Sequence, residues 1–152
     1  MPDGRIQTFS LKKEGTCVCI LPITENGKVV LARQYRPGPD EVLDELPGGG
    51  PEKGESHIAA AKRELLEETG YEPTEIISLG MAHECGYSTV IREGFLALGC
   101  KKISEPTLDQ NEFIEPIEKS IDDFIEQLLQ GKCTDPEFGW MGLYKMGIIK
   151  KT

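Results

Sequence analysis

Three glutamates in one short stretch of the chain have the residue type and spacing to do chemistry. Glu64, Glu67 and Glu68 lie between Ser56 and Thr69, where apolar residues recur at helical spacing. At about 100° per residue, the three carboxylates fall within roughly 100° of arc on one face of this helix. Carboxylate oxygens that converge from one side are the ligands that a hard divalent cation takes. The spacing therefore indicates a candidate metal site.

A solvated acidic face is the alternative interpretation. Like charges on one helix face repel each other, and these lie in the last turns, where the helix dipole is already negative. Lys62 and Arg63 are too few to neutralise the cluster, although Arg63 can pair with Glu67 at i,i+4. The acidic cluster lowers the local stability of the helix, whereas a bound cation would attract all three carboxylates and make the arrangement favourable.

The helix that must carry these acids has clear limits. Ser56 is a suitable N-cap, and Gly70 stands where a left-handed C-cap requires glycine. We expect the opposite side of the helix to face a core through Ile58, Ala61 and Leu65. A loop of three glycines, 48–50, flanked by Pro47 and Pro51, precedes the helix, and in such a loop the backbone can approach a ligand closely.

Loop and helix together resemble the Nudix box, the signature of the Nudix hydrolases. The matching residues, at the box spacing, are Gly49, Glu55, Arg63, Glu64, Leu65, Glu67, Glu68 and Gly70. Tyr71 departs from the pattern, because the family usually has an aliphatic residue there. The resemblance implies an α/β fold, the Nudix-type α/β/α sandwich with a mixed β-sheet between helices, and residues 1–152 as a single Nudix hydrolase domain.

The resemblance also implies a cofactor, Mg²⁺ with Mn²⁺ as a possible substitute, and roles for the box residues. Glu64 and Glu68 would be the main metal ligands, and Glu67 a ligand or the acceptor of a proton from metal-bound water. The carbonyl of Gly48 would add a backbone ligand. Arg63 would orient the glutamates rather than bind phosphate.

Segments on both sides of the box resemble the ADP-ribose pyrophosphatase-like subgroup. They read CILPITENGKVVLARQYRPG, DELPGG and NEFIEP. The resemblance implies hydrolysis of the pyrophosphate bond of a nucleoside diphosphate-sugar, with ADP-ribose favoured and AMP and ribose 5-phosphate as products. Arg36, at the end of a strand before a Pro-Gly break, would contact the substrate's phosphates or base, the alternative being an ordinary surface arginine.

Two departures from this subgroup concern substrate and catalytic base. The segment His83–Tyr87 keeps a glycine and an aromatic residue but lacks the proline usual in that turn. Gln110 stands where the family has a glutamate as base, and an amide cannot take a proton from water at neutral pH. We predict Glu112 as the replacement base and, by resemblance, as a ligand of an additional metal ion. Asp109 is the second choice, and a surface loop acid is the alternative.

Other functions have less support. A Nudix hydrolase could act on a nucleoside triphosphate, a dinucleoside polyphosphate or another NDP-sugar, and a Nudix fold could be a non-catalytic binding module. The complete acidic set argues against the module, because a binder has no need of a costly cluster. His57 and His83 lack the pattern of a zinc site, although His83 could be an accessory base.

Composition and net charge limit the class of protein, its partners and its compartment. A chain of 152 residues with 38% hydrophobic and 28% charged residues is typical of one globular domain. A net charge of −9 disfavours a nucleic-acid polymer as partner, and it equally disfavours a phosphorylated small molecule unless metal ions or local arginines neutralise the site. The nucleotide-type small-molecule substrate is what the resemblance implies. We expect no membrane segment or signal peptide, reduced thiols for the five cysteines, and a cytoplasmic protein. A homodimer is an option that the resemblance suggests, because related enzymes are often dimers.

The remaining elements follow from apolar patterns and turn residues. A second helix is predicted over 121–130, with Ser120 and Asp123 as its capping box, and a last amphipathic segment begins at Asp135-Pro136. Strands are predicted over 4–13, 17–24, 28–34, 42–46, 75–82, 89–98 and 113–117, with a further one possible over 101–103.

Overall fold

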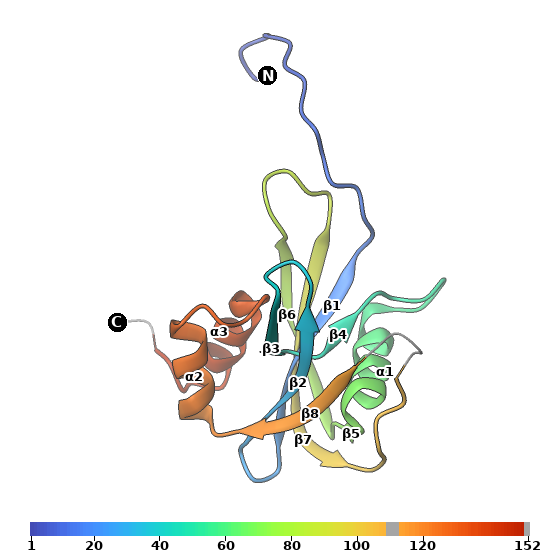
Figure 1. Ribbon diagram of the computed structural model, residues 1–152, viewed down its shortest axis with the longest axis vertical. Helices are drawn as coiled ribbons and strands as arrows, with labels where there is room; N and C mark the ends of the chain where they lie inside the picture. The colour runs from blue at the N-terminus through green and yellow to red at the C-terminus, as the bar shows by residue number, and fades with distance from the viewer. Residues whose placement is uncertain (109–112, 151–152) are drawn as a thin grey trace.

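A mixed β-sheet separates one helix from two others in a computed structural model that describes residues 1–108 and 113–150 (Figure 1). Helix α1 (His57–Thr69) covers one face, and α2 (Ile121–Leu129) and α3 (Pro136–Lys145) cover the other. This arrangement confirms the predicted α/β/α sandwich. The strands are β1 (Cys17–Thr24), β2 (Val29–Arg36), β3 (Glu41–Glu45), β4 (Gly48–Gly49), β5 (Tyr71–Glu72), β6 (Glu75–His83), β7 (Ile91–Lys102) and β8 (Ile114–Lys119).

The order of the strands brings the glycine loop to the centre of the sheet. The main path is β3-β2-β1-β7-β5, with β6 on β7, β8 on β2 and β4 on β1. The pair β1–β7 is parallel, and the other pairs are antiparallel. Strands β1 and β2 pair with each other at Ile23↔Val29, near their shared turn. Further from this turn, β2 pairs with β3 and β1 pairs with β4. The segment 41–49 therefore bridges the two strands.

Hydrophobic cores on both faces hold the helices to the sheet. Alternate residues of β1 point to opposite faces, as its period-two pattern requires. On one face Val18 and Ile20 pack with Ala60, Ala61 and Leu65 of α1. On the other, the buried residues include Leu21, Leu31, Leu96, Phe124, Phe138 and Leu143. Among the described residues, no helix is long and apolar enough to cross a membrane.

The predicted helix limits are confirmed by their caps. The hydroxyl of Ser56 accepts the Ala59 amide at 3.3 Å, and Gly70 adopts φ 77° while its amide donates to the Leu66 carbonyl. The Ser120 hydroxyl accepts the Asp123 amide at 3.1 Å at the start of α2. Ile58 is an exception to the predicted core face, because its side chain is exposed. In this first turn His57 faces the sheet instead, with its ring on Glu93 of β7.

Two strand predictions were wrong. Residues 4–13 form no strand; this segment runs away from the body (Figure 1), and its ladder contact is one bridge between Lys12 and Ser88. The alternating residues Phe9 and Leu11 are exposed, as is Ile6, so the apolar residues of this segment have no core to pack against. Residues 101–103 are not a separate strand, because β7 continues through Gly99, at φ 63°, to Lys102 and pairs there with β5.

We predict that Gly94 sets the packing of α3 on β7. A Cβ at position 94 would lie 2.0 Å from the ring of Phe138, which is fully buried. Gly94→Ala should lower the free energy of unfolding by about 1–3 kcal/mol, as overpacking does. Gly15→Ala, with no atom within 4 Å of the added carbon, is the control. Urea denaturation of both variants measures the difference, and equal stabilities would contradict the packing described here.

Candidate active site

Strand β4 and helix α1 are packed so closely that two of the acidic side chains contact the glycine loop. The carboxylate of Glu68 is buried and accepts the Gly48 amide at 2.9 Å. The carboxylate of Glu64 occupies the space beside Gly49, where an added Cβ would lie 2.4 Å from its Oε1. The predicted metal ligands Gly48, Glu64 and Glu68 are therefore brought together by the fold.

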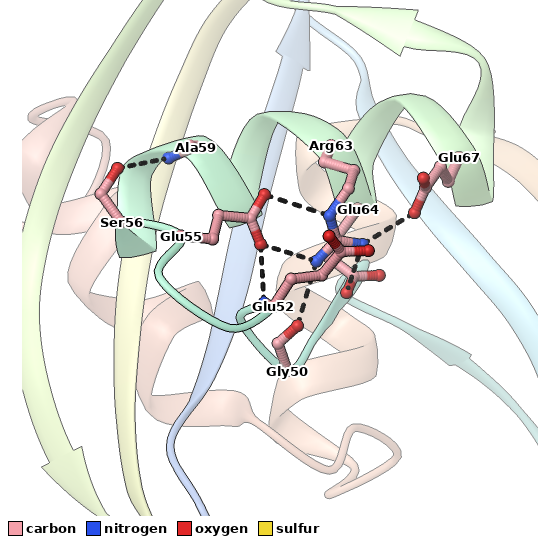
Figure 2. A network of polar contacts seen from close by, with 8 residues as sticks. All are labelled: Gly50, Glu52, Glu55, Ser56, Ala59, Arg63, Glu64 and Glu67. Carbon is pink, nitrogen blue, oxygen red and sulfur yellow. Dashed lines mark hydrogen bonds and ion pairs between the residues drawn. The ribbon is translucent and has the colours of Figure 1, made fainter.

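Arg63 lies at the centre of the remaining polar contacts (Figure 2). Its Nη1 donates to Glu64 at 3.0 Å and to Glu67 at 2.8 Å. Its Nε and Nη2 donate to the two oxygens of Glu55 at 3.1 and 3.0 Å, and Nη2 also donates to the Gly50 carbonyl. The guanidinium group of Arg63 thus connects the glycine loop, through Gly50, to Glu55, Glu64 and Glu67.

These contacts keep both partners charged. Hydrogen bonding to Glu55 above all, and to the other two acids, raises the pKa of Arg63 above its ordinary value. The same bond from Arg63 lowers the pKa of Glu55. Removing Arg63 would therefore leave several carboxylates close together without their counter-charge.

The donor chemistry of this site fits a hard divalent cation. All its candidate ligands are oxygen atoms, from three carboxylates and the glycine loop, and such atoms suit Mg²⁺ or Mn²⁺. In the described part of the chain, no group of three or more His, Cys, Asp or Glu side chains is already arranged as a metal cluster. Glu64 and Glu67 turn toward Arg63 instead, so a cation would compete with this guanidinium for them.

Arg36 lies beside the glycine loop, although twelve positions of sequence separate it from Gly48. Both line a cavity of about 200 Å³, the inner cavity, together with Gly49, Cys17 and Asp135. A larger cavity of about 590 Å³, the outer cavity, adjoins it and shares Cys17, Arg36 and Asp135. A continuous depression therefore leads from the box loop past Arg36.

Glu45 holds Arg36 in this position and was not predicted as a site residue. Its side chain is fully buried and forms an ion pair with the Arg36 guanidinium, while its Oε1 has no hydrogen-bond partner in the described part of the molecule. Burial of a carboxylate is costly unless the charge is paired. The available sequence signal was a charged residue directly before the loop, in a short strand that leads into the box.

The predicted catalytic base cannot be compared with the structure. Glu112, Asp109 and Gln110 fall outside the described residues, so the assignment of Glu112 as base and metal ligand stays a prediction. The five cysteines are free thiols, as expected. Cys17, at the junction of the two cavities, has its pKa raised mainly by burial, so this thiol adds no negative charge at neutral pH.

Comparisons with known proteins identify the family. Residues 13–127 match the family model of the NUDIX domain, and the chain belongs to this family. It is 31% identical over 137 residues to a methanol dehydrogenase activator of Bacillus methanolicus, covering 89% of this chain and 74% of that one. It is 30% identical over 128 residues to an ADP-ribose pyrophosphatase of Bacillus subtilis (strain 168), covering 83% and 69%.

Solved structures agree on the fold. A NUDIX hydrolase from Nitrosomonas europaea superimposes with a TM-score of 0.68 at 24% identity, covering 90% of this chain and 96% of that one. A crystal structure of an ADP compounds hydrolase gives a TM-score of 0.63 at 24% identity, with 73% and 61% covered. At 24% identity, these two structures support the assignment of the fold alone. The family match and the curated relatives establish that the chain is a Nudix hydrolase, and Nudix hydrolases generally use divalent metal ions.

We predict that Gly49 and the neighbouring Gly50 differ sharply in their tolerance of a side chain. Gly49→Ala would displace the Glu64 carboxylate, whereas at Gly50 an added Cβ meets no atom within 4 Å. Because Glu64 is a flexible side chain, the free energy of unfolding should change by less than about 1 kcal/mol. Turnover with Mg²⁺ should fall about 10- to 100-fold in Gly49→Ala, as for other small misplacements of catalytic groups. Equal turnover in the two variants would remove Glu64 from the reaction.

Proposed function

We propose that this enzyme hydrolyses the pyrophosphate bond of a nucleoside diphosphate-sugar in a Mg²⁺-dependent reaction. ADP-ribose is the favoured substrate, with AMP and ribose 5-phosphate as products. The observation that carries the proposal is the depression that joins the box loop to Arg36. A Bacillus subtilis relative of this chain is an ADP-ribose pyrophosphatase, which supports the same choice.

The metal would be held by Glu64 and Glu68, by Glu67 directly or through water, and by the Gly48 carbonyl. A bound divalent cation supplies neutralisation of the pyrophosphate charge and activation of a water molecule. Arg63 keeps Glu64 and Glu67 near each other through one nitrogen, which orients both before a cation arrives. Glu112 remains our choice for the base that takes the proton from water.

Arg36 would bind the diphosphate. The chain carries a net charge of −9, so an anionic substrate needs a local cation to be attracted to this molecule. Arg36 lines the inner cavity together with Gly48 and Gly49. Its ion pair with buried Glu45 fixes its position, so little side-chain freedom is lost when substrate binds.

A nucleotide panel tests the reaction itself. ADP-ribose, another NDP-sugar, ATP and a diadenosine polyphosphate are each incubated with enzyme and Mg²⁺, and AMP and pyrophosphate release are scored. We expect the highest kcat/KM for ADP-ribose, with AMP released and no pyrophosphate. A clear preference for ATP with pyrophosphate release would replace the proposed substrate class, and no turnover with any nucleotide would contradict the proposed reaction.

We predict that Glu68→Gln separates metal binding from folding. The amide oxygen of Gln can still accept the Gly48 amide, but the negative charge is lost. kcat should fall by about two orders of magnitude or more, whereas the metal-free protein should be as stable as wild type because like-charge repulsion is relieved. Mg²⁺ should raise the Tm of wild type by more than that of the variant. A variant that keeps its activity but loses metal-free stability would make Glu68 purely structural.

We predict that Arg36→Lys raises KM for ADP-ribose by about 10-fold, because an ammonium group cannot reproduce the bidentate contact of a guanidinium. Alanine is a poor test here, because it would leave buried Glu45 unpaired at a cost of about 3–5 kcal/mol. Arg33→Lys is the matched control on the same strand, since Arg33 pairs with Asp44 and lines neither the inner nor the outer cavity. If KM were unchanged in Arg36→Lys at normal stability, Arg36 would not bind substrate.

A further inference from the structure

The turn between β2 and β3 forms one wall of the outer cavity. Arg36 and Glu41 are the last paired residues of the two strands, and residues 37–40 connect them. Arg36 and residues 37–39 of the turn line the cavity. Arg36 pairs with Glu45 through its Nε, so within the described residues its two terminal nitrogens remain available for a ligand. The conformation of this turn therefore affects how Arg36 is presented to a substrate.

The sequence of the turn allows few backbone conformations. Pro37 and Pro39 have φ fixed at about −65°, and a residue before a proline is restricted to extended backbone. Asp40 completes the turn at φ 58°, the one positive φ of a non-glycine residue in the described part of the chain. Side chains with a Cβ disfavour this left-handed region. Asp40 therefore needs a contact that keeps it there.

Tyr35 supplies this contact. Its hydroxyl donates to Oδ1 of Asp40 at 2.6 Å, and the bond raises the pKa of Tyr35, so the hydroxyl keeps its proton at neutral pH. Neighbouring residues of a strand point to opposite faces, so the side chain of Tyr35 points away from that of Arg36. Tyr35 lines neither the inner nor the outer cavity. It can hold the turn in place without contacting a ligand in either cavity.

We propose that Tyr35 and Asp40 are positioning residues for substrate binding, because their hydrogen bond keeps residues 37–40 in the conformation that presents Arg36 to the substrate. This inference rests on the proposed function, in which Arg36 binds the diphosphate. A turn that is ordered in advance loses little freedom when a substrate binds. Where only a fraction of the molecules has the binding-competent turn, the apparent affinity falls by that fraction.

Tyr35→Phe tests the proposal, because it removes the hydroxyl and keeps the ring. KM for ADP-ribose should rise about 3- to 10-fold, as for a competent fraction of about a third to a tenth. kcat should be unchanged, since the complexes that form react as before. Hydrogen exchange of the amides in 38–41 should be faster. Tyr144→Phe is the matched control, because Tyr144 is also exposed and lines neither cavity.

Two substitutions of Asp40 separate the hydrogen bond from the backbone conformation. Asp40→Asn keeps an acceptor oxygen and a residue type that tolerates positive φ, so its KM should stay within about twofold of wild type. Asp40→Gly adopts the same φ without steric cost but has no acceptor, so its KM should rise as in Tyr35→Phe. Combining Asp40→Gly with Tyr35→Phe should raise KM no further, because both changes remove the same bond.

Each outcome decides the assignment. Faster hydrogen exchange in Tyr35→Phe at unchanged KM would limit the bond to a structural role and overturn the inference. A lower kcat at unchanged KM would overturn it too, as would equal increases of KM in Asp40→Asn and Asp40→Gly. If thermal unfolding showed Tyr35→Phe to be unstable, the two Asp40 variants would decide alone.

Failure of the proposed function gives a different result. If the wild-type enzyme preferred a nucleotide other than an NDP-sugar, the proposed substrate would be wrong, and KM for the preferred nucleotide would test Tyr35 and Asp40 in the same variants. If the wild-type enzyme hydrolysed no nucleotide, the proposed reaction would be contradicted and the inference with it.

Discussion

The site depends on a steric constraint, the space for a bare backbone between β1 and α1. An added Cβ at Gly48 would lie 2.2 Å from the Val18 carbonyl, and one at Gly49 would enter the carboxylate of Glu64. With no side chain in the way, β4 pairs with β1 on one side and receives Glu68 on its amide on the other. The same close packing that joins loop to helix therefore brings carboxylate and backbone oxygens into one region.

Electrostatic pairing then holds a set of charges that would otherwise repel. Three acids of the box, Glu55, Glu64 and Glu67, pair with Arg63, and Arg36 is paired with a carboxylate that is fully buried. Such pairs add little net stability, since desolvation offsets much of the attraction. Their value here is position: each charged group is set in place by the folded protein before a metal ion or substrate binds.

The path of the chain between β2 and β4 explains why the candidate metal site and the inner cavity are adjacent. Strand β2 carries Arg36 at its end, β3 returns along it to Glu45, and β4 then joins β1. The turn after Arg36 includes Asp40 at φ 58°, a conformation uncommon for residues other than glycine. The resulting inner cavity is lined by the glycines that contact Glu64 and Glu68 and by the paired arginine Arg36.

The sequence by itself determined the features that local interactions decide. Helix α1, its caps at Ser56 and Gly70, and the acidic face follow from spacing and capping within a few turns, and the box spacing was enough to indicate the family. Most strands follow from β-branched apolar runs between turn residues.

Tertiary structure alone decided what depends on distant neighbours. The apolar residues of 4–13 resemble a strand, yet no sheet edge receives them; Ile58 has the right period, yet His57 faces the sheet in its turn. Glu45 is a charged residue in the strand before the glycine loop, but its buried pairing with Arg36 could not be read from the sequence, because only folding brings the two side chains together. Periodicity reports which side of an element is apolar, whereas the packing of the whole chain decides which polar groups it encloses.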